Sequence, residues 1–302
     1  MQASFLTVVL LPVALAVIML GLGLGLTLED FKRVVVYPRA VFVGLVCQSL
    51  LLPLCAFGLA HAFGLDGRLA VGLMLLAASP GGATANLFSH LARGDVALNV
   101  TLTATNSVLS LLTLPLLVNV SLAHFLGEGR SIPMQPSKVI QVFAVVLVPI
   151  AIGMLVRAKK PVVAERLDRP VRILSAVFLF LVIGAAVVKE RAGLAAAVRE
   201  VGLAALVFNL VSLGVGYVVP RLARLPERQA VAIGMEIGIH NGTLAIAVAS
   251  SPQLLNDGRM AIPPAIYSLL MYFTAAAFSW MSARRLMALE IRERAAGRPI
   301  RS

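Results

Sequence analysis

The stretch Gly234-Met235-Glu236-Ile237-Gly238-Ile239-His240-Asn241-Gly242-Thr243 decides how the rest of this chain is interpreted. It places a carboxylate, an imidazole and an amide inside a segment that is otherwise apolar from residue 230 to residue 248. Among the acidic residues, Glu236 alone lies far from the expected end of any segment. An ionisable side chain at the centre of a membrane helix costs about 2.5–3.5 kcal/mol or more, so it normally faces a partner or a wet cavity. Glu236 therefore marks the candidate functional site.

The composition is that of a protein embedded in a membrane. Of the 302 residues, 59% are hydrophobic and 13% are charged, and the mean hydropathy is +0.93. Apolar runs long enough to cross a bilayer recur along the chain. The first run, residues 5–26, has no lysine or arginine before it and is too long for a signal-peptide core, so we expect a retained span. The sequence thus predicts an all-α integral membrane protein.

Nine membrane spans are expected, joined by short connections that often contain proline or glycine. They cover residues 5–26, 39–63, 69–91, 96–124, 139–156, 171–188, 201–220, 229–251 and 262–283. One side of these spans holds most of the lysines and arginines, including those of the basic tail 287–302, and the positive-inside bias places that side in the cytoplasm. This explains the net charge of +12 without a nucleic-acid partner. We expect a multi-pass protein of the cell's inner (plasma) membrane, with the amino terminus outside and the carboxyl terminus in the cytoplasm.

A weak internal repeat relates the two halves of the chain. When the sequence is shifted by 160 residues, residues 65–71 fall on residues 225–231 and Gly82 falls on Gly242; one further residue of shift places Gln48 on Asn209. Five spans separate the matching segments, and because five is odd the two copies have opposite orientations in the membrane. Many secondary transporters have such an inverted-topology repeat. The first repeat would comprise residues 1–127 with four spans, and the second residues 136–286 with five.

Each repeat contains one span that is expected to break near the middle of the membrane, at residues 79–86 and 238–243. The first break reads Ser79-Pro80-Gly81-Gly82-Ala83-Thr84, and both proline and glycine weaken a helix. Unwound backbone at that depth is tolerated only inside the protein or along a cavity. It exposes carbonyl oxygens, which suit a cation, and the N–H groups of the next half-helix, which suit an anion. A kink or close helix packing is the alternative for the first break, and the matching break beside Glu236 favours a binding site.

Oxygen-bearing side chains surround the first break. Asn86 follows it, and Asn99 and Thr103 on the next span are four residues apart, hence on one face of a helix. Together with Glu236 they offer a cage for a hard, monovalent cation. Hydrogen bonds between helices are the alternative interpretation of such polar side chains, and they account for Thr105, Ser107 and Ser110.

The remaining polar and small residues do not indicate catalysis. His61, His90 and His124 lie near the ends of spans, where an interfacial position is expected. Glycines recur at positions 21, 23 and 25, and because no strand precedes them we expect close helix packing rather than a nucleotide-binding loop. The sequence contains no HExxH, GxSxG or P-loop motif, so we expect neither a common type of membrane enzyme nor an ATP-driven pump.

Three stretches of the sequence resemble the bile acid:sodium symporter family. They are residues 79–86, Leu91-Ala92-Arg93-Gly94-Asp95-Val96-Ala97-Leu98, and residues 236–242. The resemblance covers nearly the whole chain and is to a bacterial member of the nine-helix form, which lacks the first helix. It implies a core domain, in which two broken helices cross at mid-membrane, and a panel domain beside it. It also implies sodium-driven uptake of an organic anion, such as a bile acid or a small carboxylate like pantoate or a 2-keto acid.

The resemblance further implies which residues bind each ligand. One sodium site is implied at Asn86, Asn99, Thr103 and Glu236. A second sodium site is implied at Gln48, Glu236, Ile237, Ile239 and His240. The substrate anion is implied to lie at the starts of two half-helices, beside Ala83, Thr84, Asn241, Gly242 and Thr243.

Three positions depart from the pattern of that family. Ala85 stands where a sodium-ligating serine is found, and Asn99 stands where serine is usual but still offers an oxygen. His240 stands where glutamine is common, and an imidazole nitrogen is a poor ligand for a hard cation. Only the main-chain carbonyl of His240 is then expected to bind sodium, so both one and two sodium ions stay open.

The expected function is secondary active transport of an organic anion with Na⁺, by alternating access. We expect a small-molecule substrate and the lipid bilayer as partners, with no obligate protein partner and no enzymatic step. A proton-coupled or an uncoupled organic-anion transporter is the alternative. Proton coupling is considered because His240 follows Glu236 closely and imidazole titrates near neutral pH. A channel is less favoured because it does not need an inverted repeat, and an intramembrane enzyme is the remotest alternative.

Overall fold

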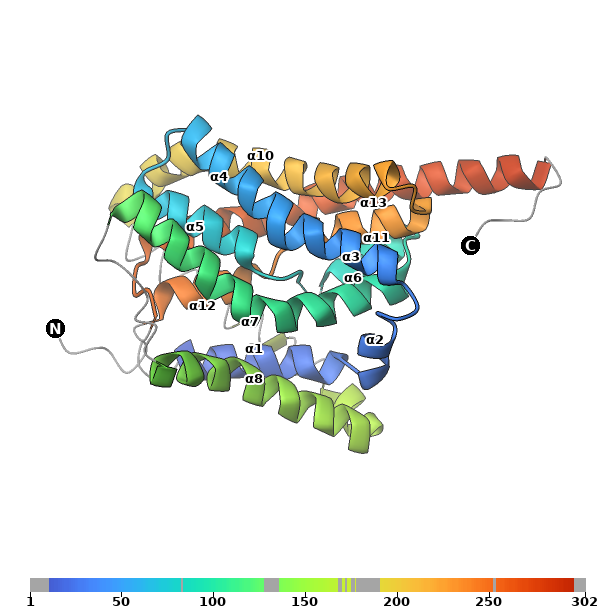
Figure 1. Ribbon diagram of the computed structural model, residues 1–302, viewed down its shortest axis with the longest axis horizontal. Coiled ribbons are helices and arrows are strands. Elements are labelled where there is room, and N and C mark those ends of the chain that lie inside the picture. The colour runs from blue at the N-terminus through green and yellow to red at the C-terminus, as the bar shows by residue number, and fades with distance from the viewer. Residues whose placement is uncertain are drawn as a thin grey trace.

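The computed structural model describes residues 11–82, 84–127, 136–167, 170–171, 173–174, 177, 191–251 and 254–295. Apart from one isolated β-bridge, these residues form helices and the connections between them (Figure 1). The longer helices are α1 (Leu11–Gly25), α3 (Pro38–Val46), α4 (Leu52–Ala62), α5 (Gly67–Ala78), α6 (Thr84–Leu91), α7 (Val96–Leu126), α8 (Pro136–Lys159), α10 (Arg191–Leu222), α11 (Glu227–Gly238), α12 (Gly242–Ser250) and α13 (Ile262–Ala295). Shorter elements are α2 (Leu28–Lys32), a π-helical turn (Cys47–Leu51) and a 3-10 turn (Arg259–Ala261).

Four helical stretches of the described chain are long and apolar enough to cross a membrane. They are Pro38–Ala62, Val96–Leu126, Val198–Leu222 and Arg259–Leu289. Each coincides with a predicted span to within a few residues, and the helical, membrane-embedded class is thereby confirmed. The predicted span 171–188 lies mostly outside the described residues, as do residues 1–10 and 296–302. The total of nine spans therefore stays a prediction.

Two of the predicted spans are interrupted at the expected places. α5 ends at Ala78 and α6 begins at Thr84, while α11 ends at Gly238 and α12 begins at Gly242. The four pieces have 12, 8, 12 and 9 residues, whereas about 20 are needed to cross a bilayer. Each pair can therefore cross only as two half-helices placed end to end.

The local sequence explains where these half-helices stop and start. Pro80 clashes with a helical conformation of the residue before it, and Ser79 accordingly adopts extended dihedral angles, φ −74° and ψ 142°. At the second break, the Asn241 side chain accepts a 3.0 Å hydrogen bond from the Leu244 N–H and thereby caps α12. Asp95 caps α7 in the same way, accepting from the Leu98 N–H at 3.0 Å.

The span 39–63 was expected to be an uninterrupted helix, but it contains the π-helical turn Cys47–Leu51 between α3 and α4. Pro53 follows this turn and has no N–H to donate to the carbonyl four residues earlier, so the regular helical ladder is interrupted here. Gln48 lies in this turn and is buried. Such π-helical insertions occur frequently at functional sites.

Helices α1 and α8 pack against each other and lie together along one side of the molecule (Figure 1). A Cβ atom placed on Gly23 of α1 would overlap the carbonyl oxygen of Ile150, and one on Gly153 of α8 would lie 2.6 Å from the carbonyl oxygen of Leu20. Small residues let the backbones of membrane helices approach closely. The close packing predicted for the glycines at 21, 23 and 25 is thus confirmed at Gly23.

Substituting Gly23 by alanine is expected to lower the free energy of unfolding by about 1–3 kcal/mol, the usual cost of overpacking. The reason is that the added methyl group would strike main-chain atoms of α8, which cannot rotate away. Gly25→Ala is the matched control, because a Cβ atom on Gly25 meets nothing within 4 Å. Thermal unfolding of the two variants in detergent measures the difference, and equal midpoints would contradict this packing.

Candidate functional site

The two helix breaks contact each other directly through their backbones. Gly81 and His240 form an antiparallel β-bridge. The Gly82 N–H donates to the Ile239 carbonyl at 2.6 Å, and the Asn241 N–H donates to the Pro80 carbonyl at 2.8 Å. Polar backbone groups that the breaks remove from the helical ladder are therefore satisfied across the crossing, as a membrane interior requires.

Gly81 provides the space in which the Glu236 carboxyl group lies. A Cβ atom on Gly81 would overlap Glu236 Oε1 and Cδ. At Gly82 the space is less tight, because a Cβ atom would lie 3.2 Å from the His240 carbonyl oxygen. The Pro80-Gly81-Gly82 sequence therefore does more than break the helix, since it brings bare backbone against the carboxyl group of Glu236.

Glu236 is fully buried, and its carboxyl group faces α7. Thr103 Oγ1 donates to Glu236 Oε2 at 2.6 Å, and Asn106 Nδ2 donates to Oε1 at 3.4 Å. Across the described residues, no lysine, arginine or histidine forms an ion pair with this carboxyl group. Buried charges are normally paired or bound to metal ions. The Gly81 N–H also donates to this carboxyl group, so all of its donors are neutral. They leave the charge of an ionised Glu236 uncompensated, and a small cation would compensate it.

One face of α7 supplies the side chains around Glu236. Asn99, Thr103 and Asn106 are spaced at four and three residues, hence along a single helical stripe, and all three are buried. Asn99 Nδ2 donates to the Ala232 carbonyl at 2.7 Å, one turn before Glu236 on α11. The predicted proximity of Asn99 and Thr103 to α11 is thereby observed.

Four buried side-chain oxygens near this face have no hydrogen-bond partner. They belong to Asn86, Ser89, Asn99 and Asn106. They lie on α6 and α7, which pack against each other and against α11, the helix of Glu236. Since buried polar atoms are almost always satisfied, these unpartnered oxygens are candidate ligands for an ion that accepts lone pairs. Hard cations prefer this kind of donor set.

Two of these residues, Ser89 and Asn106, are absent from the predicted sodium site. The sequence spacing could have identified both residues. Ser89 follows Asn86 by three residues and Asn106 follows Thr103 by three, so each lies one helical turn further along the same face as a predicted ligand. Among the described residues, no group of three or more histidine, cysteine or acidic side chains could hold a metal ion. The donor set here therefore consists mainly of neutral oxygens.

The residues of the second predicted sodium site are brought together only in part. Gln48 Nε2 donates to the carbonyls of Ala77 and Ser79 at 3.2 and 2.8 Å, while its Oε1 atom is buried without a partner. His240 Nδ1 lies 3.2 Å from the Ser79 carbonyl. Gln48 and His240 thus meet at the end of α5, whereas the carboxyl group of Glu236 is hydrogen-bonded to α7.

The main-chain carbonyls of the second predicted site are already engaged at two positions. The Ile239 carbonyl accepts from the Gly82 N–H at 2.6 Å, and the His240 carbonyl accepts from the Gly242 N–H at 2.9 Å. The imidazole of His240 stacks on Phe208, with ring centroids 5.8 Å apart, and meets the edge of Tyr267. Its Nε2 atom is buried and has no partner. This aromatic setting does not resemble a cage for a hard cation.

The predicted anion site falls at the starts of α6 and α12. Asn241 uses its Oδ1 atom to cap α12 and its N–H to reach Pro80, which leaves its side-chain amide N–H groups as donors. Gly242 packs against α13, because a Cβ atom there would overlap Ser268 Oγ. Thr84 and Thr243 are half-buried at the first turns of their helices. Ala83 lies outside the described residues.

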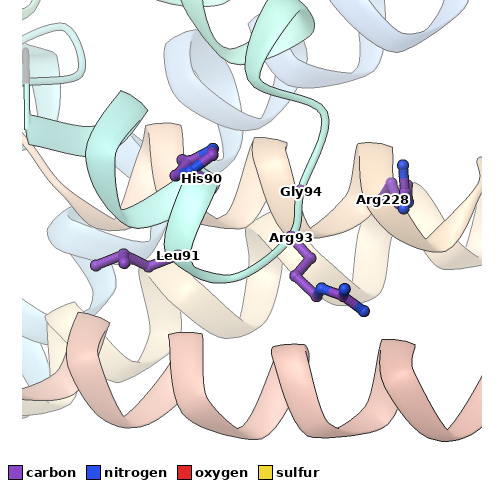
Figure 2. A pocket seen from close by; sticks show the side chains of 5 residues that line it. All are labelled: His90, Leu91, Arg93, Gly94 and Arg228. Carbon is purple, nitrogen blue, oxygen red and sulfur yellow. The ribbon is translucent and has the colours of Figure 1, made fainter.

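A cavity of about 490 Å³ lies away from these residues, at the end of α6 and the beginning of α11. Figure 2 shows its lining, in which His90 comes from the end of α6, Arg93 from the connection between α6 and α7, and Arg228 from α11. The Asp95 N–H donates to the Arg228 carbonyl at 3.0 Å and joins the two elements. None of the residues predicted to bind sodium or the anion lines this cavity.

Most of the chain is similar to known proteins. Residues 12–197 match the sodium bile acid symporter family. The chain belongs to this family. It is 30% identical over 266 residues to the uncharacterized sodium-dependent transporter YocS of Bacillus subtilis, which covers 86% of this chain and 78% of that protein.

Two further relatives show the breadth of the sodium bile acid symporter family. The ileal sodium/bile acid cotransporter of Oryctolagus cuniculus is 27% identical over 273 residues, 89% of this chain and 77% of that protein. The probable sodium/metabolite cotransporter BASS2, chloroplastic, of Oryza sativa subsp. japonica is 27% identical over 258 residues, 85% of this chain and 60% of that protein. The family is one of sodium-dependent membrane transporters rather than enzymes.

Proposed function

We propose that this chain is a secondary active transporter that takes up an organic anion together with sodium, by alternating access. The observation that supports this most strongly is the fully buried Glu236 at the crossing of two broken helices, together with unpartnered oxygens on α6 and α7, which pack against its helix α11. A site that has one carboxyl group and neutral oxygens suits a monovalent cation.

In the proposed first sodium site, Na⁺ is bound by Asn86, Asn99, Thr103 and Glu236, and we add Ser89 and Asn106 as contributors. Sodium would compensate the Glu236 carboxylate and satisfy amide oxygens that otherwise lack a donor. Because these side chains come from α6, α7 and α11, the ion would fix the first break relative to the second. Sodium binding would thereby organise the neighbouring half-helix starts for the anion.

The second sodium site, at Gln48, Ile237, Ile239 and His240, receives less support from the contacts. Gln48 Oε1 is available as a ligand, whereas His240 presents a nitrogen. We therefore propose one sodium ion as the minimal stoichiometry. The buried, unpartnered Nε2 atom of His240 is the observation that favours a second candidate, in which a proton replaces sodium as the coupling ion.

The proposed anion site is formed by the starts of α6 and α12, where N–H groups point away from the helix and favour a negative charge. Thr84, Asn241 and Thr243 would supply polar contacts, with Ala83 and Gly242 allowing close approach of the backbone. The anion would be a bile-acid-like molecule or a small carboxylate such as pantoate or a 2-keto acid.

The proposed alternating-access mechanism requires two domains that move relative to each other and an inverted repeat, and a pair of matching contacts supports the repeat. Gln48 binds the carbonyls that end α5, and its repeat counterpart Asn209 donates to the Gly238 carbonyl that ends α11, at 3.1 Å. The same amide-to-carbonyl contact thus occurs in both proposed repeats. α1 and α8 would belong to the panel domain and the broken helices to the core. The proposed orientation places the carboxyl terminus in the cytoplasm.

Uptake into proteoliposomes tests the proposed function. A radiolabelled carboxylate should accumulate when sodium is high outside, and should not accumulate with a pH gradient in sodium-free buffer. Carboxylates can first be ranked by thermal stabilisation in sodium, since a ligand that binds the folded state raises its stability. Accumulation that follows the pH gradient alone would replace sodium coupling by proton coupling.

Substituting Asn99 or Thr103 by alanine is expected to raise the sodium concentration for half-maximal uptake by about tenfold, because each loses one oxygen worth roughly 1.5 kcal/mol next to a charge. Sodium titrations of uptake or of thermal stabilisation measure this shift. Thr105→Ala is the matched control on the same helix, since its hydroxyl group bonds only to the Thr101 carbonyl at 2.8 Å. If the Asn99 and Thr103 variants have the sodium titration of the control, these residues do not bind the ion.

A further inference from the structure

Two histidines meet at the opposite end of the helices from the cavity of Figure 2. His61 lies in the last turn of α4 and His124 in the last turn of α7, and both side chains are exposed. Their Nε2 atoms are 3.0 Å apart. The proposed transport cycle uses neither residue, and neither contacts the crossing of the broken helices. This histidine pair therefore needs its own explanation.

Aromatic neighbours hold the two imidazoles in place. The ring of Phe57 lies 4.7 Å from the His61 ring and 4.8 Å from the His124 ring, measured between centroids. Phe125 packs on both imidazoles from the other helix, at 5.2 and 4.8 Å. Gly67 permits the start of α5 to lie against the end of α7, because a Cβ atom there would overlap the Phe125 carbonyl oxygen. The pair is thus a preorganised contact between two helix ends.

The distance between the two nitrogens suits one metal ion. Zinc–imidazole bonds are about 2.0–2.1 Å long, so two nitrogens 3.0 Å apart would bind one ion at an angle of about 94°. A tetrahedral angle needs a separation of about 3.3 Å with the same bond lengths, which is a small side-chain movement. Imidazole is a preferred ligand for zinc, copper and nickel but not for magnesium or calcium. Both residues also lie at carboxyl ends of helices, where the backbone dipoles favour a cation.

We propose that His61 and His124 form a surface binding site for a late first-row divalent cation, of which Zn²⁺ is the representative. Each imidazole would give its Nε2 lone pair to the ion, and water would complete the coordination. The nearby acidic residue of the α4–α5 connection, Asp66, is engaged by Arg259 at 3.2 Å and is not needed as a ligand. The bound ion would join the end of α4 to the end of α7, just before the chain leaves α7 for α8.

Zinc titration by calorimetry tests this site with tag-free protein in detergent. We expect wild-type protein to bind Zn²⁺, and His61→Gln and His124→Gln each to weaken binding by about 100-fold or more, since loss of even an outer-shell partner costs roughly 10–100-fold. His90→Gln is the matched control, because His90 is an exposed histidine in the last turn of α6. If all three variants bind zinc as the wild type does, the pair is not a metal site.

A further readout keeps the test independent of transport and of misfolding. Zinc should raise the unfolding temperature of wild-type and His90→Gln protein but not of the other two variants, whereas Mg²⁺ should have no effect on any of them. Stabilisation by zinc that is the same in His61→Gln protein would overturn the proposal.

Discussion

Glu236→Gln protein is expected to lose sodium-stimulated uptake and sodium-dependent thermal stabilisation. Breaking a buried ion pair by removing one partner costs about 3–5 kcal/mol, which is at least a hundredfold in sodium affinity. The glutamine keeps the size of the side chain and can still accept a hydrogen bond from Thr103. It removes the negative charge that the ion would compensate, and it replaces one of the two accepting oxygens by an NH2 group.

The stability of this variant without sodium separates loss of the site from loss of the fold. Removing an uncompensated buried charge should leave the unfolding temperature in sodium-free buffer unchanged or higher. Glu227→Gln is the matched control on the same helix, because Glu227 pairs with Arg221 and Arg285 near the surface, both at 3.1 Å. A wild-type sodium response in Glu236→Gln protein would remove Glu236 from the sodium site and with it the main support for sodium coupling here.

Gly81→Ala is expected to lower the free energy of unfolding by about 1–3 kcal/mol and to weaken the sodium response, because the added methyl group overlaps the Glu236 carboxyl group. Gly214→Ala in α10 is the control, since a Cβ atom there meets nothing within 4 Å. Thermal unfolding with and without sodium measures both effects.

A double-mutant cycle identifies the cause of this destabilisation. If the methyl group acts by displacing the carboxyl group, Gly81→Ala should cost much less in a Glu236→Ala background, where the carboxyl group is absent. Additive costs in the two single variants and the double variant would show instead that Gly81 is needed for the backbone crossing itself.

The sequence was sufficient to predict features that depend on neighbouring residues. Pro80 and the glycines around it predict where α5 ends, and the four-residue spacing of Asn99 and Thr103 predicts that they share a face. The carboxylate of Glu236 inside an apolar segment predicts a polar site, which the structure shows as contacts with Thr103 and Asn106.

Features that depend on long-range contacts were missed or only partly predicted. The bridge between Gly81 and His240 joins positions 159 residues apart, and no local pattern specifies its register. The predicted grouping of Gln48 with Glu236 does not anticipate that Gln48 donates to the carbonyls at the end of α5, because these contacts join positions 29 and 31 residues apart. The sequence does not predict Ser89 and Asn106 as part of the site, because burial of their oxygens follows from the packing of three helices rather than from either helix alone.

The hydrogen bonds between the two breaks have a consequence for biosynthesis. The Pro80 carbonyl and the Gly82 N–H find their partners only in Asn241 and Ile239, which are translated some 160 residues later. At about 5–20 residues per second, the ribosome needs roughly 8–30 seconds to add them. During this interval these two backbone groups of the first helix break lack their hydrogen-bond partners in the second break. A nascent chain stalled before residue 239 is added should therefore be degraded faster than one stalled after residues 239–241 have entered the membrane.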